Sequence, residues 1–281
     1  MTKIEKTIEL NGKTLTLTTG ELAGQAAGAV TARMGDTVVL ATVAVAPLKT
    51  PLDYFPLTVE YLERLYAGGR IKGSRWVKRE GRPTDEEILS ARLIDRSIRP
   101  LFPKSYKREV QVVVTVLSVD GENNPAVLGA IATSAAVHLS GLPWKGPVAP
   151  LSVGLIDGKY ILNPLNSEVE ASKLDLTVSV TNEAILMIEA GANEATEEEV
   201  LGGVKFAAKE AEKVLNLIDA LAKEAGRERE SYAEEKPPAE LVSQVKKLVQ
   251  DKIPSLVASL ATHEGGQFDE LAELTAAVNE K

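Results

Sequence analysis

The first 47 residues alternate polar and apolar side chains in short runs, and turn residues separate these runs. Asn11-Gly12 and Gly35-Asp36 lie between such runs, and Asn-Gly is a strong signal for a short hairpin. Because successive side chains of a strand point to opposite faces of a sheet, this alternation predicts half-buried strands. The chain is therefore expected to begin as a series of antiparallel hairpins.

Helix signals follow the strands. Thr84 and Glu87 form a capping-box pattern, which predicts a helix that Pro100 closes. An Ala- and Gly-rich helix is expected over 125–140, and a long helix over 196–225, again with a capping box at its start. Further strands are expected near 109–119, 151–156, 174–180 and 184–189. Strands and hairpins combined with three helices predict an α+β fold.

The segment 226–238 holds seven charges in 13 residues and ends in a proline pair, which is typical of a linker. Beyond it the pattern is helical, with Leu241, Val245 and Leu248 on one face. The predicted domains are a first domain over 1–226, a charged linker over 227–238 and an incomplete all-helical domain over 239–281.

Composition excludes several kinds of protein. The 281 residues are 44% hydrophobic, which suits a globular protein, and none is cysteine, which excludes disulfides, thiolate metal sites and cysteine nucleophiles. No apolar run approaches the roughly 18 residues of a membrane span, and the start is unlike a signal peptide. We expect no membrane partner and a cytoplasmic location.

Positive charge is concentrated in one segment. Residues 64–108 hold 13 of the 32 Lys and Arg residues and only five acids, although the whole chain has a net charge of −8. Such a segment attracts polyanions at one place, which is typical of nucleic-acid or phosphate recognition. Trp76 lies there beside Lys78, Arg79 and Arg82, an arrangement that can stack a base and bind its phosphates, although a solvated loop with a buried Trp76 is an alternative.

Three arginines of the predicted helix, Arg92, Arg96 and Arg99, lie at helical spacing on one narrow stripe. They are candidates for contact with phosphate or RNA. Asp95 lies on the same stripe, one turn from Arg92 and from Arg99, so an ion-pair network is the alternative.

The run AGGRIKGSRWVKREGRPTDEEILSARLIDRSIRPLFP, from Ala67 to Pro103, resembles the signature of bacterial polynucleotide phosphorylase, in the first of its two RNase PH-like domains. NPAVLGAIATSAAVHLSGLP and ILNPLNSEVEASKLDLTVSV extend the resemblance. It implies mixed β-sheets flanked by helices, followed by a small all-α region. It also implies a homotrimeric ring that degrades single-stranded RNA from the 3′ end with inorganic phosphate, releases nucleoside diphosphates, acts in mRNA degradation and uses a divalent metal, Mg.

The resemblance also assigns roles. The family usually has two phenylalanines and two arginines in the loop that grips RNA, and Trp76, Val77, Lys78 and Arg79 occupy the matching positions. Val77 removes one stacking face, whereas the charge and one aromatic ring remain. The resemblance therefore implies RNA binding by Trp76, Lys78, Arg79 and Arg82.

No catalytic residue is assigned within the chain. The helix that opens at Pro125 could bind phosphate at its N-terminus, but Asp120 and Glu122 precede it and would repel an anion. The active second repeat of the family has a serine-rich loop there, and later an acidic cluster with a lysine. In this chain only Asp175 stays in register, and Val169, Lys173 and Thr177 replace the other members.

The remaining polar residues do not supply a site. We expect Asp175 to be structural, Glu168 and Glu170 to be exposed, and His138 to serve packing, while His263 belongs to the helical region. No metal site is assigned, so the expected Mg binds outside this segment. The GxSxG, dinucleotide and P-loop patterns are missing.

The leading hypothesis is the N-terminal part of a phosphorolytic exoribonuclease that guides RNA and assembles the ring, with the phosphorolytic site in a second repeat. A non-catalytic RNA-binding or structural module whose arginines serve subunit contacts is the alternative. A self-sufficient single-domain exonuclease is the third hypothesis, and it would need an acidic cluster.

Overall fold

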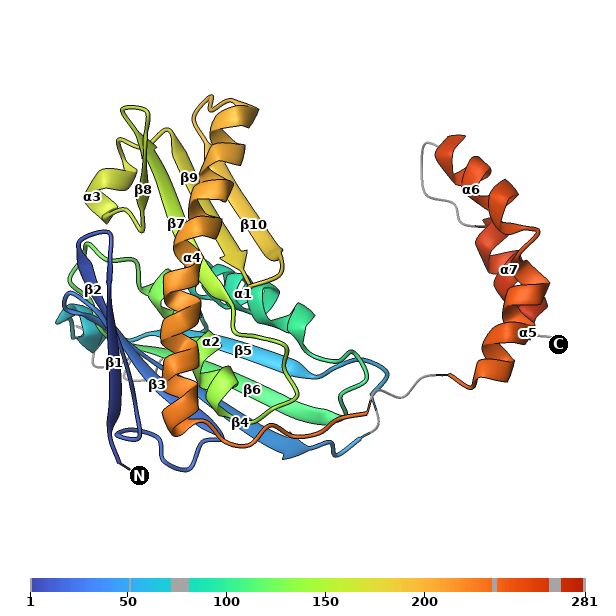
Figure 1. Cartoon of the computed structure of the whole chain (residues 1–281), viewed down its shortest axis with the longest axis horizontal. Helices are drawn as coiled ribbons and strands as arrows, with labels where there is room; N and C mark the ends of the chain where they lie inside the picture. The colour runs from blue at the N-terminus through green and yellow to red at the C-terminus, as the bar shows by residue number, and fades with distance from the viewer. Residues whose placement is uncertain (1, 51, 72–80, 234–236, 263–268, 280–281) are drawn as a thin grey trace. The chain divides into compact units, whose positions relative to one another are not determined.

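The structure, a computed structural model, describes residues 2–50, 52–71, 81–233, 237–262 and 269–279 (Figure 1). The chain forms two compact units, Met1–Tyr232 and Ala233–Lys281. Unit 1 contains two β-sheets with helices packed against them, and unit 2 is helical. This arrangement confirms the expected α+β class.

The larger sheet of unit 1 has six strands in the spatial order β1-β2-β3-β4-β6-β5. Their bounds are β1 Ile4–Leu10, β2 Lys13–Thr19, β3 Gly28–Met34, β4 Thr37–Pro47, β5 Leu57–Glu63 and β6 Arg108–Ser118. The β1-β2 hairpin turns at Asn11 and Gly12, whose φ angles of 52° and 73° are those of the predicted tight turn. All neighbours are antiparallel except β5 and β6, which pair in parallel and make the sheet mixed.

The second sheet has four antiparallel strands in the order β10-β9-β7-β8. They are β7 Ala149–Ile156, β8 Lys159–Leu162, β9 Leu174–Val180 and β10 Ile185–Ala192. The sequence predicted β7, β9 and β10, whereas β5 in the first sheet and the short β8 were not foreseen. Edge strand β5 matters most for the site, because it lies beside the first helix.

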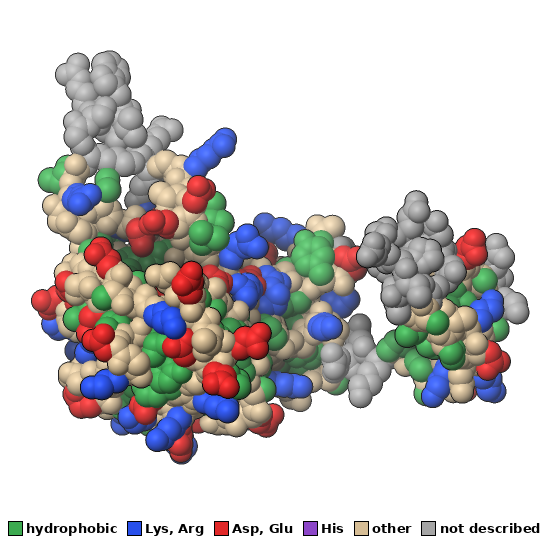
Figure 2. Space-filling view, turned by 90° about the horizontal axis from the view of Figure 1, so that it is seen from above, with side chains coloured by type: hydrophobic (Ala, Val, Ile, Leu, Met, Phe, Trp, Pro, Cys, Tyr) green, Lys and Arg blue, Asp and Glu red, His purple; other side chains and the backbone are tan. Residues whose placement is uncertain are grey.

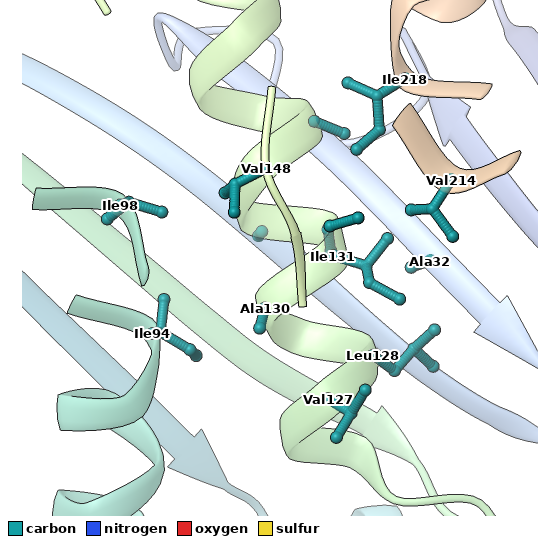
Figure 3. Packing of buried hydrophobic residues seen from close by; sticks show 14 of the residues in the cluster. Ala32, Ile94, Ile98, Val127, Leu128, Ala130, Ile131, Val148, Val214 and Ile218 are labelled. Atoms are coloured by element: carbon teal, nitrogen blue, oxygen red, sulfur yellow. The ribbon is translucent and has the colours of Figure 1, made fainter. Parts of the chain in front are cut away.

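The helices of unit 1 fill the space beside and between the sheets (Figure 1). They are α1 Asp85–Ile98, α2 Pro125–Leu139, α3 Asn166–Val169 and α4 Glu197–Ala225, with 3-10 turns η1 Leu65–Gly68 and η2 Arg99–Leu101. Helix α2 is buried almost all round and contacts β3, β4, β7 and α4. Figure 3 shows Ile131 and Leu128 of α2 on the side of Ala32 from β3 and Val214 from α4, while Ile94 of α1 lies on the other side of the helix.

Unit 2 contains α5 Ala239–Val249, α6 Ile253–Thr262 and α7 Asp269–Asn279. Several of its large apolar side chains stay exposed, namely Leu241, Val242, Leu248, Ile253, Val257 and Leu271. No helix in the described part of the chain has both the length and the apolar character needed to cross a membrane.

Candidate nucleic-acid interface

The residues to which the resemblance assigns RNA binding all precede α1 in the chain. Trp76, Lys78 and Arg79 lie outside the residues that the structure describes. Arg82 is described and exposed, and it has no hydrogen bond or ion pair with another described residue. Among the described residues, nothing therefore occupies its side chain.

Helix α1 starts as the sequence predicts. Thr84 accepts a hydrogen bond from the Glu87 N–H at 3.2 Å, and the Glu87 carboxylate accepts one from the Thr84 N–H at 2.7 Å. Glu87 also accepts from the Glu63 N–H at 2.8 Å, which ties the start of α1 to the end of β5. Ile94 and Ile98 on the opposite side of α1 are fully buried. The helix therefore has a fixed orientation, with its arginine stripe outward.

Arg99 is held by the protein itself. It forms a two-point ion pair with Asp95 at 2.5 Å and donates to the main-chain oxygens of Phe55 and Leu57 at 3.3 and 3.0 Å. The hydrogen bonds that Arg99 donates to the Asp95 carboxylate raise the pKa of Arg99, although partial burial opposes this effect. The expected ion pair with Asp95 is thus confirmed for Arg99, whose donors anchor the end of α1 to edge strand β5.

Arg96 and Arg92 are more open. Arg96 pairs with Glu189 on β10 at 2.6 Å, and both side chains remain about half exposed, so the pair adds little to stability. No local pattern indicates this partner, which lies 93 positions away in the chain. Arg92 is exposed and makes no ion pair or hydrogen bond with any described residue. Only these two arginines of the stripe can readily bind a ligand.

A groove of about 470 Å³ lies between β5 and α1. Its lining combines Arg92 and Arg96 with carboxylates and apolar side chains from both elements, namely Val59, Glu60, Tyr61, Leu62, Pro83, Glu87, Ile88, Ala91 and Asp95. Figure 2 shows Lys and Arg side chains gathered near the middle of the face seen from above, with acidic side chains beside them. The groove can therefore bind a phosphate only at places where the positive charge of its arginines exceeds the negative charge of its carboxylates.

The first turn of α2 offers little to an anion. Pro125 has no N–H, and the Asn124 side chain accepts from the Ala126 N–H at 2.8 Å and from the Val127 N–H at 3.4 Å. These are three of the four positions whose N–H groups are unpaired at a bare helix end, and the fourth is the N-cap Asn124 itself. The N-cap side chain and the proline together therefore account for the N–H groups at 125–127.

Asp120 adds a fixed negative charge close to this end. Its carboxylate accepts hydrogen bonds from the Glu122 and Asn123 N–H groups, the Asn123 side chain and the Thr37 hydroxyl, at 2.6 to 2.9 Å. Partial burial opposes ionisation, but these bonds hold the pKa of Asp120 well below its usual range. Asp120 therefore stays ionised at neutral pH and disfavours phosphate.

The acidic side chains between Glu168 and Asp175 do not come together at one site. Asp175 is exposed near the start of β9 and lines a cavity of about 110 Å³, and Lys173 is paired with Glu199 at 2.8 Å. Glu170 is exposed as expected. Glu168 is half-buried and accepts from the Leu165 N–H, so its expected free exposure was wrong. Among the described residues, no three His, Asp or Glu side chains lie close enough to hold a metal ion.

His138 has more than a packing role, which corrects the expectation from its apolar neighbours. Its Nε2 lies 3.0 Å from the Asp219 carboxylate, and its Nδ1 lies 3.4 Å from Nη2 of Arg229. Burial lowers the pKa of His138, and Arg229 lowers it further, while Asp219 opposes both. The partners lie 81 and 91 positions away, so no local pattern indicated them. His263 lies outside the described residues.

Comparison with known families matches unit 1 along most of its length. Residues 11–143 match "3' exoribonuclease family, domain 1", and residues 146–210 match "3' exoribonuclease family, domain 2". The first match includes the basic residues before α1, α1 itself and all of α2, and the second includes the smaller sheet and the first half of α4.

Curated relatives agree with these matches. The polyribonucleotide nucleotidyltransferase of Deinococcus radiodurans is 44% identical over 97% of this chain and 34% of its own length. Those of Caulobacter vibrioides and Thermus thermophilus are 53% and 48% identical over 79% and 85% of this chain, and 31% and 33% of their own lengths. The chain thus spans about a third of the length of these relatives.

Among solved structures, rice (Oryza sativa) Rrp46 superposes with a TM-score of 0.60 and 16% identity, over 75% of this chain and 94% of that one. At this identity the likeness shows the fold alone. It agrees with the expected RNase PH-like arrangement of sheets and helices.

Proposed function

Because this chain belongs to the 3′ exoribonuclease family, and within it to the bacterial polyribonucleotide nucleotidyltransferases, we propose that it is the N-terminal part of a phosphorolytic 3′-to-5′ exoribonuclease. The longer protein would cleave RNA with inorganic phosphate, release nucleoside diphosphates and act in mRNA degradation. In this proposal residues 1–226 are its first RNase PH-like domain, 227–238 the linker and 239–281 the start of an all-helical domain.

The segment itself guides single-stranded RNA and takes part in assembling a homotrimeric ring in the cytoplasm. Arg82 and Arg92 support the guiding role, since both are exposed and have no partner among the described residues. Arg96 adds to it, because a surface ion pair is easily exchanged for a phosphate. Trp76, Lys78 and Arg79 complete the proposed RNA contact through stacking and charge.

One observation carries the proposal that phosphorolysis occurs elsewhere: the N–H groups of the first turn of α2, at positions 125–127, are either absent or already bonded to the Asn124 side chain. A phosphate bound there would meet the ionised Asp120 and no free donor from that turn. Asp175 is the one aspartate of the expected cluster, so the residues present do not fit a magnesium site. Phosphate and Mg are therefore assigned to a second repeat.

RNA binding is tested on the purified 281-residue chain with a single-stranded oligonucleotide at several salt concentrations. Replacing Lys78, Arg79 and Arg82 by Ala is expected to weaken binding and to flatten its salt dependence. The matched control replaces Lys205, Lys209 and Lys223, which are exposed on α4 and change the net charge equally. Equal losses in both triple variants would contradict a local RNA site.

Phosphorolysis is tested with radiolabelled RNA, phosphate and magnesium. The chain alone is expected to release almost no nucleoside diphosphate, whereas a longer chain that includes a second repeat should release it readily. Robust release by the 281-residue chain would place the active site within it and would favour a self-sufficient exonuclease.

Arginines that serve structure and subunit contacts are the second candidate function. The bonds from Arg99 to Asp95, Phe55 and Leu57 favour it for that residue. If the variant that lacks Lys78, Arg79 and Arg82 binds RNA normally but forms an assembly of different mass in solution, these cations belong to a subunit interface.

A further inference from the structure

The last segment of unit 1, residues 227–232, follows α4 and is bound to the body of the unit; it is called the strap below. The Arg227 N–H donates to the Leu139 carbonyl at 3.0 Å, and the Glu230 N–H donates to the Gly141 carbonyl at 2.7 Å. The Arg227 guanidinium reaches the Ala26 carbonyl at 3.1 Å. The sequence of the strap is charged like that of a solvated linker, yet its residues contact the body of unit 1.

Gly141 is required for this arrangement. Its φ of +77° is unfavourable for other residues, and a Cβ atom there would lie 2.6 Å from the Glu228 carbonyl oxygen. A side chain at this position would therefore push the strap away from the end of α2.

Two side chains fix the far end of the strap. Glu230 accepts from the Tyr106 hydroxyl at 2.9 Å and pairs with Arg108 at 3.3 Å. Tyr232 donates to the Ser105 carbonyl, and its ring meets that of Tyr106 edge-on at 5.2 Å between centroids. Tyr106 is only 1% exposed, and burial, with the nearby Glu230, raises its pKa to about 12. The strap therefore covers a buried aromatic side chain.

Tyr106 continues into a row of aromatic rings. It lies 5.9 Å from Phe55, Phe55 lies 4.8 Å from Phe102, and Phe102 lies 6.1 Å from Trp144, all between centroids. Such tilted contacts add to the free energy gained by burial. The row joins the strap to residues that lie around the end of α1.

Two hydrogen bonds connect this row to α1 itself. The Trp144 indole N–H donates to the Ile98 carbonyl at 2.9 Å, and the Phe55 carbonyl accepts from Arg99. The last turn of α1 and the ion pair between Arg99 and Asp95 thus contact the row of aromatic rings, whose first member, Tyr106, packs against Tyr232.

We propose that the strap is a conformational latch: when it is docked, it holds the C-terminal end of α1 in place through Tyr106, Phe55, Phe102 and Trp144. Undocking removes the cover from Tyr106 and loosens the row, so the end of α1 and η2 open more often. The chain thereby links the segment that leaves unit 1 to the helix that carries Arg92 and Arg96, and the latch does not depend on what those arginines bind.

The test is hydrogen exchange of the whole 281-residue chain, read by mass spectrometry of its peptides. The variant that combines Glu230→Gln with Tyr232→Ala is expected to speed exchange roughly tenfold in the strap and also in peptides covering 94–106, with 149–162 in the smaller sheet unchanged. Glu228→Gln is the control, since the side chain of Glu228 is exposed and makes no bond with any described residue.

A second variant reaches the strap without touching any aromatic side chain. Gly141→Ala is expected to displace the strap backbone and to give the same pattern, with faster hydrogen exchange both in the strap and in peptides covering 94–106. Faster exchange confined to the strap in both variants would overturn the latch, and so would an even increase over all of unit 1, which indicates general destabilisation.

Discussion

Two helix starts in unit 1 look alike in the chain but differ in what they leave unpaired. Helix α1 begins with a capping box and carries Arg92 without any partner among the described residues, beside a groove of about 470 Å³. Helix α2 begins with Asn124 and Pro125, which cap or remove the N–H groups of its first turn, and Asp120 fixes a negative charge beside it. Ligand capacity thus depends on which polar groups remain unsatisfied after folding, and a helix end by itself is not an anion site.

The largest effect is expected at the α2 start, where Asp120→Asn should destabilise the chain by about 2 kcal/mol at neutral pH. An amide cannot accept all the hydrogen bonds that the carboxylate receives from Thr37, Glu122 and Asn123. Urea unfolding measures the loss. Asp157→Asn is the control, because Asp157 is an exposed turn residue at φ 49°, which Asn tolerates well.

The same substitution carries a pH test. Because the folded protein lowers the pKa of Asp120 below the ordinary 3.8, its contribution is present above that pH and is lost as the pH falls further and the folded carboxylate takes a proton. The stability gap between wild type and the Asn variant should therefore narrow only below about pH 4. A gap that stays constant down to pH 2 would mean that the charge of Asp120 plays no part.

Arg99 is expected to give the next largest effect, on stability and not on RNA. Arg99→Ala removes the ion pair with Asp95 and leaves the edge carbonyls of Phe55 and Leu57 to water, so we expect a loss of about 1.5 kcal/mol in urea unfolding. RNA affinity should change by less than about twofold. A large loss of affinity at unchanged stability would move Arg99 to the binding surface.

Arg92 should behave in the opposite way. Arg92→Ala removes an exposed side chain without a partner among the described residues, so stability should stay within about 0.5 kcal/mol. RNA affinity is expected to fall about fivefold at low salt, and the slope of affinity against salt should drop by about one. Lys209→Ala on α4 is the control of equal charge. Unchanged RNA affinity in the Arg92 variant would remove α1 from the proposed RNA path.

The sequence predicted local features well and distant ones poorly. The hairpin at Asn11 and the capping boxes at Thr84 and Thr196 depend on residues a few positions apart, and the structure confirms them. Edge strand β5 was missed, since it pairs in parallel with β6, about 50 positions away, and no short turn marks such a pair.

The site follows the same rule. The pair between Asp95 and Arg99 has helical spacing and could be predicted, whereas Glu189 approaches Arg96 only after the smaller sheet has formed. Asn124 followed by Pro125 is a local N-cap signal that could also have been predicted, whereas the sequence argument about phosphate at this helix start considered only Asp120 and Glu122. The sequence predicts a linker over 227–238 and gives no sign of the contacts of the strap, because the partners of the strap, Leu139, Gly141 and Tyr106, lie about 90 to 120 positions earlier.

The smallest effect tests whether Arg96 differs from Arg92 only because Glu189 holds it. Glu189→Gln removes a half-exposed partner, so stability should change by less than about 0.5 kcal/mol. Arg96 then becomes as open as Arg92, and the chain also loses one negative charge near the groove. RNA affinity should therefore rise about twofold, and this gain should vanish when Arg96→Ala is added.

Glu183→Gln controls for charge alone, because Glu183 is an exposed acid in the turn before β10. An equal gain in that control, or a gain that survives the loss of Arg96, would show that the ion pair does not limit RNA contact at α1.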